Sequence, residues 1–97
     1  METIETIVIT RHQSYVQHLE GMGLIEPGAL VVAHATPEDV AGRHVLTSGL
    51  PLHLAALAAK LTTVGLFLPA ELRGKELTLE EVEQYAQPAA SYVVRTA

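Results

Sequence analysis

The sequence contains no cysteine, few charged residues and no long hydrophobic run. The absence of cysteine excludes disulfides, thiol catalysis and zinc sites with thiolate ligands. No apolar segment approaches the roughly 20 residues that cross a membrane as a helix, and the acidic start of the chain is not typical of a signal peptide. We therefore expect a cytoplasmic protein with no membrane partner.

Positive charge is also scarce, since 6 Lys and Arg stand against 11 Asp and Glu. A formal net charge of -5 argues against a broad basic face that binds long nucleic acid. It leaves room for a small anion held by two or three well-placed cations. With 48% hydrophobic residues in 97 positions, the composition is that of a folded chain, and the length predicts a single domain over residues 1–97.

Hydrophobic patterns predict strands that alternate with helices. Strands are expected at residues 4–10, 29–33, 43–47 and 64–68, with an edge strand at 91–96. Helices are expected after His12, as one turn after Thr36, over residues 51–61 and after the capping-box pattern at Thr78. This alternation predicts a small three-layer, Rossmann-like α/β domain with a mainly parallel sheet of about four or five strands. The helix at 51–61 is apolar nearly all round, so we expect it to be covered on more than one side.

In such a fold the loops after the strands lie at one edge, where ligands bind near the switch in strand order. Arg11 follows the first strand and offers a planar cation beside the backbone N–H groups of a helix start. Arg73 and Lys75 flank Gly74 in the loop after the fourth strand. The alternatives are a solvent-exposed polar turn at Arg11 and a solvated charged face at residues 73–75. Small candidate ligand-binding residues complete this edge: Thr10, Ser48 and Gly49.

Two histidines are candidates for proton transfer, because His12 and His53 are each expected in the first turn of a helix at this edge. A neutral imidazole there can accept a proton near pH 7. For His53 the alternative is a partly buried histidine bonded to a carbonyl. His34 lies at the same edge without a recognisable partner, and His44 is expected at the opposite edge in a structural role. Since no spacing is typical of a metal site, we expect neither metal nor cofactor.

Three segments carry a family resemblance: I-V-I-T-R-H at 7–12, L-P-L-H-L-A-A at 50–56 and L-P-A-E-L-R-G-K-E-L at 68–77. In this order they resemble small CRISPR-associated accessory proteins of type III systems, grouped with the ring nucleases, over nearly the whole chain. The resemblance implies a CARF-like domain. It also implies binding of a cyclic oligoadenylate second messenger, most often cyclic tetra-adenylate, and its cleavage to end the antiviral response.

The candidate residues are compatible with that chemistry. A homodimer would offer Arg11, Arg73 and Lys75 twice to the four phosphates of the ring, and the apolar helix predicted at 51–61 would supply its contact surface. Metal-independent attack by a ribose 2′-hydroxyl would leave linear adenylates with 2′,3′-cyclic phosphate ends, with His12, Arg11 and His53 as the catalytic candidates. Two alternatives stay open: a sensor or sponge that binds the ring without cutting it, and a structural subunit of an effector complex.

Overall fold

The computed structural model describes residues 4–97 and contains one five-stranded sheet. Its strands are β1 (Thr6–Ile9), β2 (Leu30–Val32), β3 (His44–Thr47), β4 (Lys60–Thr63) and β5 (Ala90–Tyr92). They lie in the order β2-β1-β3-β4-β5, and only β5 is antiparallel to its neighbour. The predicted α/β fold with a mainly parallel sheet is confirmed.

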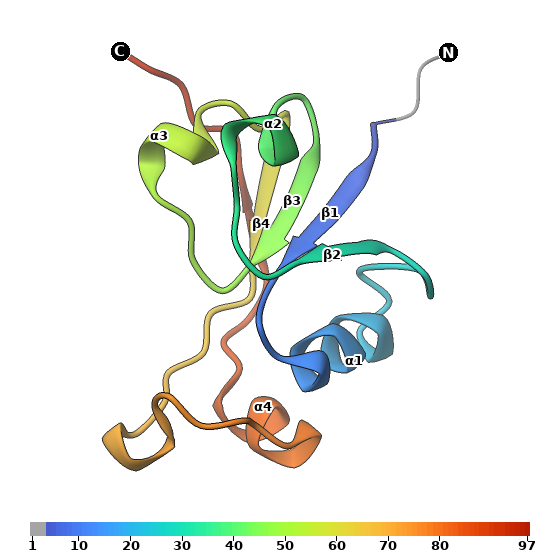
Figure 1. Ribbon diagram of the computed structural model, residues 1–97, viewed down its shortest axis with the longest axis vertical. Helices are drawn as coiled ribbons and strands as arrows, with labels where there is room; N and C mark the ends of the chain where they lie inside the picture. The colour runs from blue at the N-terminus through green and yellow to red at the C-terminus, as the bar shows by residue number, and fades with distance from the viewer. Residues whose placement is uncertain (1–3) are drawn as a thin grey trace.

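Helices cover both faces of this sheet, so the fold has three layers (Figure 1). They are α1 (Gln13–Gly21), α2 (Pro37–Val40), α3 (Leu52–Ala55) and α4 (Leu79–Tyr85), with a 3-10 turn at Ala70–Leu72. Successive side chains of a strand point to opposite faces. Val8 therefore packs in one core with α1 and α4, whereas Ile7 and Ile9 pack in a second core with α2 and α3. No helix within residues 4–97 combines the length and the hydrophobicity of a membrane span.

The helix predicted over residues 51–61 is much shorter in the structure, because α3 ends after four residues. The chain leaves β3 in an extended loop that runs back along the sheet before α3 begins (Figure 1). It then reaches the amino end of β3, where the Ala59 N–H donates to the Arg43 carbonyl at 2.9 Å. Since the extended loop covers most of the return distance, one helical turn is enough before β4 starts. Within residues 4–97, no long apolar helix is therefore present to form a dimer surface.

The strand predicted over residues 64–68 is also wrong, because β4 covers Lys60–Thr63 instead. Residues 64–68 leave the sheet in extended form and run beside the end of α4, where the Phe67 N–H donates to the Tyr85 carbonyl at 3.0 Å. Leu66 packs against the core between the sheet and α1. Val64 is fully buried and Leu68 also packs against this core, whereas Phe67 is 80% exposed. The segment is thus only partly covered, and it does not form one of the strands of the sheet.

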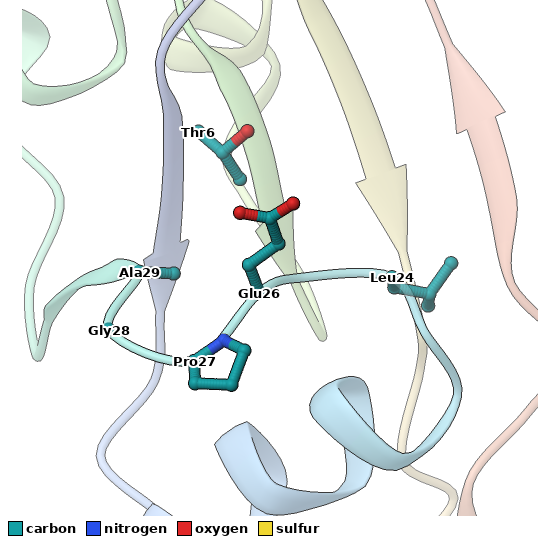
Figure 2. A pocket seen from close by; sticks show the side chains of 6 residues that line it. All are labelled: Thr6, Leu24, Glu26, Pro27, Gly28 and Ala29. Carbon is teal, nitrogen blue, oxygen red and sulfur yellow. The ribbon is translucent and has the colours of Figure 1, made fainter.

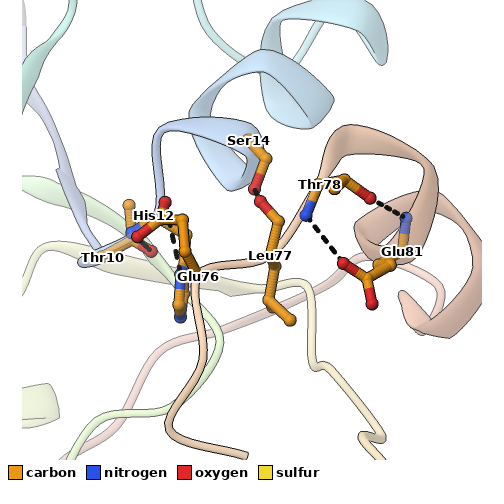
Figure 3. A network of polar contacts seen from close by, with 7 residues as sticks. All are labelled: Thr10, His12, Ser14, Glu76, Leu77, Thr78 and Glu81. Atoms are coloured by element: carbon orange, nitrogen blue, oxygen red, sulfur yellow. Dashed lines mark hydrogen bonds and ion pairs between the residues drawn. The ribbon is translucent and has the colours of Figure 1, made fainter. Parts of the chain in front are cut away.

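The start of α4 is fixed by the capping box that the sequence predicts. The Thr78 hydroxyl accepts from the Glu81 N–H at 3.2 Å, and the Glu81 carboxylate accepts from the Thr78 N–H at 3.0 Å (Figure 3). Thr36 and Asp39 form the same reciprocal pair at the start of α2. Because the cap defines where α4 begins, it also fixes the place of the loop that precedes Thr78.

Candidate functional site

The strand order changes direction between β1 and β3. On one side of β1 lies β2, and on its other side lie β3 and then β4. Crevices that bind ligands form at such a point, at the carboxyl ends of the strands. The register pairs Ile9 with Thr47, so Thr10 and Ser48 are the next residues along adjacent strands. The buried Thr47 hydroxyl donates to the Ile9 carbonyl at 2.9 Å and joins the two strand ends. The structure therefore brings Thr10, Ser48 and Gly49 to one place.

The turn from β1 into α1 presents the first predicted cation and the first predicted histidine. The Thr10 hydroxyl accepts from the His12 N–H at 3.1 Å, so it shapes the turn. His12 is the N-cap residue of α1, one position before the helix, and its side chain makes no capping hydrogen bond. Arg11 is exposed and points its Nη2 to within 3.4 Å of His34 Nδ1. Both Arg11 and His12 thus lie at the carboxyl end of β1.

His34 is a member of this edge for which the sequence offered no partner. The register pairs Ile9 with Val32, and Arg11 and His34 each follow two residues later. Because both residues lie the same number of positions beyond a pair of neighbouring strand residues, their side chains lie side by side. That signal is present in the sequence, but it can be read only once β2 is known to lie beside β1.

Residues 64–77 form a long segment outside the sheet after β4, which we call the excursion. Hydrogen bonds from α1 hold both of its ends. The buried Tyr15 hydroxyl donates to the Val64 carbonyl at 2.8 Å, and the buried Ser14 hydroxyl donates to the Leu77 carbonyl at 2.7 Å. Burial raises the pKa of Tyr15, so the phenol stays a neutral donor. These two bonds start from consecutive residues in the first turn of α1, so they place the excursion beside the carboxyl end of β1.

The excursion carries the second predicted group of cations. Arg73, Gly74 and Lys75 are exposed. Gly74 has a φ of +79° with nothing within 4 Å of an added Cβ, so glycine is favoured by the left-handed backbone and not by lack of space. The next residue, Glu76, places Oε1 4.0 Å from His12 Nδ1 (Figure 3). Two segments more than 60 residues apart in the chain therefore meet at one site, which we call the carboxyl-edge site: residues 10–12, 34, 48–49 and 73–76.

The prediction that His53 approaches His12 is wrong within one chain. His53 lies in α3 and lines a pocket of about 290 Å³ with Leu52, Val94 and Arg95. Because β5 runs antiparallel to β4, the residues after β5 lie at the amino end of β4. Figure 1 shows α3 near the chain's carboxyl terminus and α1 at the other end of the sheet. The extended loop after β3 moves α3 away from the edge where the sequence placed it.

His44 lies at the amino end of β3, in the structural role expected for it. Its Nε2 is 2.7 Å from the Thr62 hydroxyl, which in turn is 2.9 Å from the Ser91 hydroxyl. Burial, and then the nearby Lys60 cation, lower the pKa of His44, so its neutral form is favoured. This chain of polar contacts joins three strands and has no part in the carboxyl-edge site.

A pocket of about 380 Å³ opens at the amino end of β1, at the edge of the sheet opposite the carboxyl-edge site. Figure 2 shows the Glu26 carboxylate directed toward Thr6 across this pocket, with Pro27 and Gly28 on its wall. Among the described residues that line it, the charged one is the acid Glu26, and a carboxylate disfavours binding of an anion. Within residues 4–97, no cluster of three or more His, Cys, Asp or Glu side chains has the arrangement of a metal site.

Residues 7–95 match the model of a protein family described as "Putative CRISPR-associated protein (Cas_VVA1548)". The match includes both segments that meet at the carboxyl-edge site, residues 10–12 and 73–76. No curated protein and no solved structure matches the chain.

Proposed function

The chain belongs to this family of CRISPR-associated proteins, and from that premise we propose that it is a cytoplasmic ring nuclease of type III CRISPR defence. It binds a cyclic oligoadenylate, cyclic tetra-adenylate in the first place, at the carboxyl-edge site. It cleaves the ring to linear adenylates with 2′,3′-cyclic phosphate ends and so ends the second-messenger signal.

The observation that supports this proposal is the meeting of Arg11 and His12 with the 73–76 segment, through the 4.0 Å approach of Glu76 to His12. The site gathers Arg11, Arg73 and Lys75, half of the chain's six basic residues, although the chain is acidic overall. Exposed guanidinium and ammonium groups are the usual partners of phosphate oxygens. A proton-transfer group among these cations suits cleavage of a phosphodiester.

The cleavage step needs only groups that this site and the ring contain. The ribose 2′-oxygen attacks the adjacent phosphorus while its proton passes to the His12 imidazole, and the bond from phosphorus to the 5′-oxygen breaks. The 5′-oxygen takes a proton from the protonated imidazole or from water, so the products are balanced. Arg11 stabilises the negative charge on the phosphorane. Positioning and electrostatic stabilisation provide most of the rate, without a metal ion.

Binding involves two copies of the chain in this proposal. A ring with four phosphates has rotational symmetry, and a homodimer presents Arg11, Arg73 and Lys75 twice around its two-fold axis. Light scattering with and without cyclic tetra-adenylate measures the assembly. A monomer in both conditions at micromolar concentration contradicts the dimer.

The test of function is mass analysis of the products from cyclic tri-, tetra- and hexa-adenylate, incubated with the protein in EDTA. We expect linear products with cyclic phosphate ends, and a rate about 10²- to 10⁴-fold lower in His12→Ala with nearly unchanged affinity. His18→Ala is the matched control, because His18 lies further along α1 in the groove against α4. A ring that is bound but stays intact through many equivalents identifies a sponge, and no binding at all identifies a structural subunit.

A further inference from the structure

We propose that Glu76 is a positioning residue for His12. Its carboxylate accepts a hydrogen bond from Nδ1–H of the imidazole, and Nε2 is thereby left unprotonated to accept the 2′-hydroxyl proton. The catalytic part of this inference rests on the proposed function, whereas the state of the imidazole can be tested without any ligand.

The first observation is an unsatisfied atom. His12 Nδ1 is buried from solvent and has no hydrogen-bond partner within residues 4–97, although the side chain as a whole is 27% exposed. Buried polar atoms in folded proteins almost always have a partner, so an orphan needs an explanation. The nearby Glu76 carboxylate, 4.0 Å from this nitrogen, is the kind of acceptor that a protonated Nδ1 requires.

The second observation is that the backbone holds Glu76 at this place. The next residue, Leu77, is buried, and its carbonyl accepts the 2.7 Å hydrogen bond from Ser14. Thr78 then begins the capping box of α4. With the following two residues fixed by α1 and by α4, the Cα of Glu76 lies in a defined position beside the start of α1. Figure 3 shows the Glu76 and His12 side chains directed toward each other.

A separation of 4.0 Å is an ion-pair distance and is too long for a hydrogen bond, which needs about 3 Å. The Glu76 side chain is 77% exposed, so it can rotate toward the imidazole and close this gap of about 1 Å. Catalytic hydrogen bonds are often long in a free protein and shorten when the ligand binds. Phosphates at Arg73 and Lys75 would favour that shortening, because they repel the carboxylate from the ligand side.

The consequence for catalysis follows from the tautomer. A neutral imidazole carries its proton on one nitrogen only. When Nδ1–H is bonded to a carboxylate, Nε2 has a free lone pair and acts as the base, and the carboxylate then stabilises the imidazolium that forms. A histidine without such a partner divides between two tautomers, and only one of them has a free Nε2.

The direct test is nitrogen NMR of the ligand-free protein at about pH 8.5, well above the usual pKa of histidine. We expect His12 to be mainly the Nδ1–H tautomer in the wild type and a mixture in Glu76→Ala. Glu76→Gln, which keeps an acceptor oxygen, should restore much of the wild-type signal. Glu71→Ala is the control, since it removes an exposed carboxylate of the same excursion and should leave His12 unchanged. The same tautomer ratio in the wild type and in Glu76→Ala overturns the proposal.

The kinetic test separates a positioning role from a structural one. Glu76→Ala should lower the turnover of bound ring about 10- to 100-fold and leave the affinity for intact ring equal or higher, because a negative charge is removed. In the His12→Ala background the same change should lower the rate no further. Equal factors in both backgrounds would refute action through His12. If the wild type cleaves no cyclic adenylate, the proposed function fails, and the NMR result alone still decides the role of Glu76.

Discussion

Ser14→Ala is the substitution that most directly tests how the site is assembled. The buried Ser14 hydroxyl donates to the carbonyl of Leu77 at 2.7 Å, and Leu77 is also buried. The two residues are 63 positions apart in the sequence. Alanine fits the same space but cannot donate. The substitution therefore leaves the shape of the core intact and leaves one buried carbonyl without a partner.

The expected loss in the free energy of unfolding follows from the removal of this hydrogen bond. A neutral hydrogen bond contributes about 1 kcal/mol net, and an acceptor left buried and unsatisfied raises the loss to about 1–3 kcal/mol. Urea denaturation measures this loss. With a slope of about 1–2 kcal/mol/M for a small domain, the midpoint should fall by roughly 0.5–3 M at an unchanged slope. Ser48→Ala is the stability control, because Ser48 is exposed at the sheet edge and should lose less than about 0.5 kcal/mol.

Binding should change as well, since the Ser14 bond holds the end of the excursion that carries Arg73 and Lys75. We expect weaker binding of cyclic tetra-adenylate in Ser14→Ala even where the protein is fully folded, measured by calorimetry at low temperature. A midpoint equal to that of the wild type would refute the energetic reasoning. A lowered midpoint with unchanged affinity would show that the excursion keeps its place without this bond.

Three further outcomes are expected. Arg11→Ala and Arg73→Ala should each weaken ring binding by about 1.5–3 kcal/mol where the phosphate contact is buried, and Lys75→Ala by less; titration checks this. Because burial lowers the pKa of His44, the unfolded chain binds a proton there more readily. The stability that neutral His44 contributes is complete above about pH 6.5 and is lost as the pH falls toward the lower pKa of the folded state. The urea midpoint of His44→Gln should therefore depend less on pH than that of the wild type between about pH 7.5 and 5.5. Thr62→Val should cost about 1–3 kcal/mol, because it removes a buried hydroxyl that contacts both His44 and Ser91.

The parts of the fold that the sequence predicts well are those whose pattern is local. The β-branched run around Ile7 is a strand, the expected helix after His12 forms and buries Tyr15 and Leu19, and the capping box at Thr78 starts α4. In each case short-range periodicity or capping chemistry agrees with the tertiary structure. The same applies to Arg11 and His12, which directly follow a strand that the pattern identifies.

The wrong predictions concern segments whose apolar residues pack against other parts of the fold than the local pattern suggests. Residues 64–68 are more hydrophobic than Lys60–Thr63, yet the sheet takes the latter, because it is there that the chain returns beside β3. The prediction of a helix over residues 51–61 fails in a similar way, because its buried apolar side chains belong to three different elements: Ala55 to α3, Ala58 to the turn that follows it and Leu61 to β4. The segment that joins the sheet is set by the length of chain needed to return from the end of β3 to its start. A local hydrophobic pattern carries no information about that length.

The charge distribution gives an independent reason to expect two chains around one ring. Of the basic residues at the amino edge, Arg43 is 3.2 Å from the Glu5 carboxylate and is neutralised by it. At the carboxyl edge one copy offers three cations, Arg11, Arg73 and Lys75, and two exposed carboxylates, Glu71 and Glu76, that can turn away from an anion. Its positive charge toward the ring is therefore at most about three. That is too little to balance four phosphates, and its attraction over distance is weakened further by salt. Two copies double the cations that the ring meets, and the carboxylates can turn away because both are exposed. On the proposed function, we therefore expect a stoichiometry of one ring to two chains.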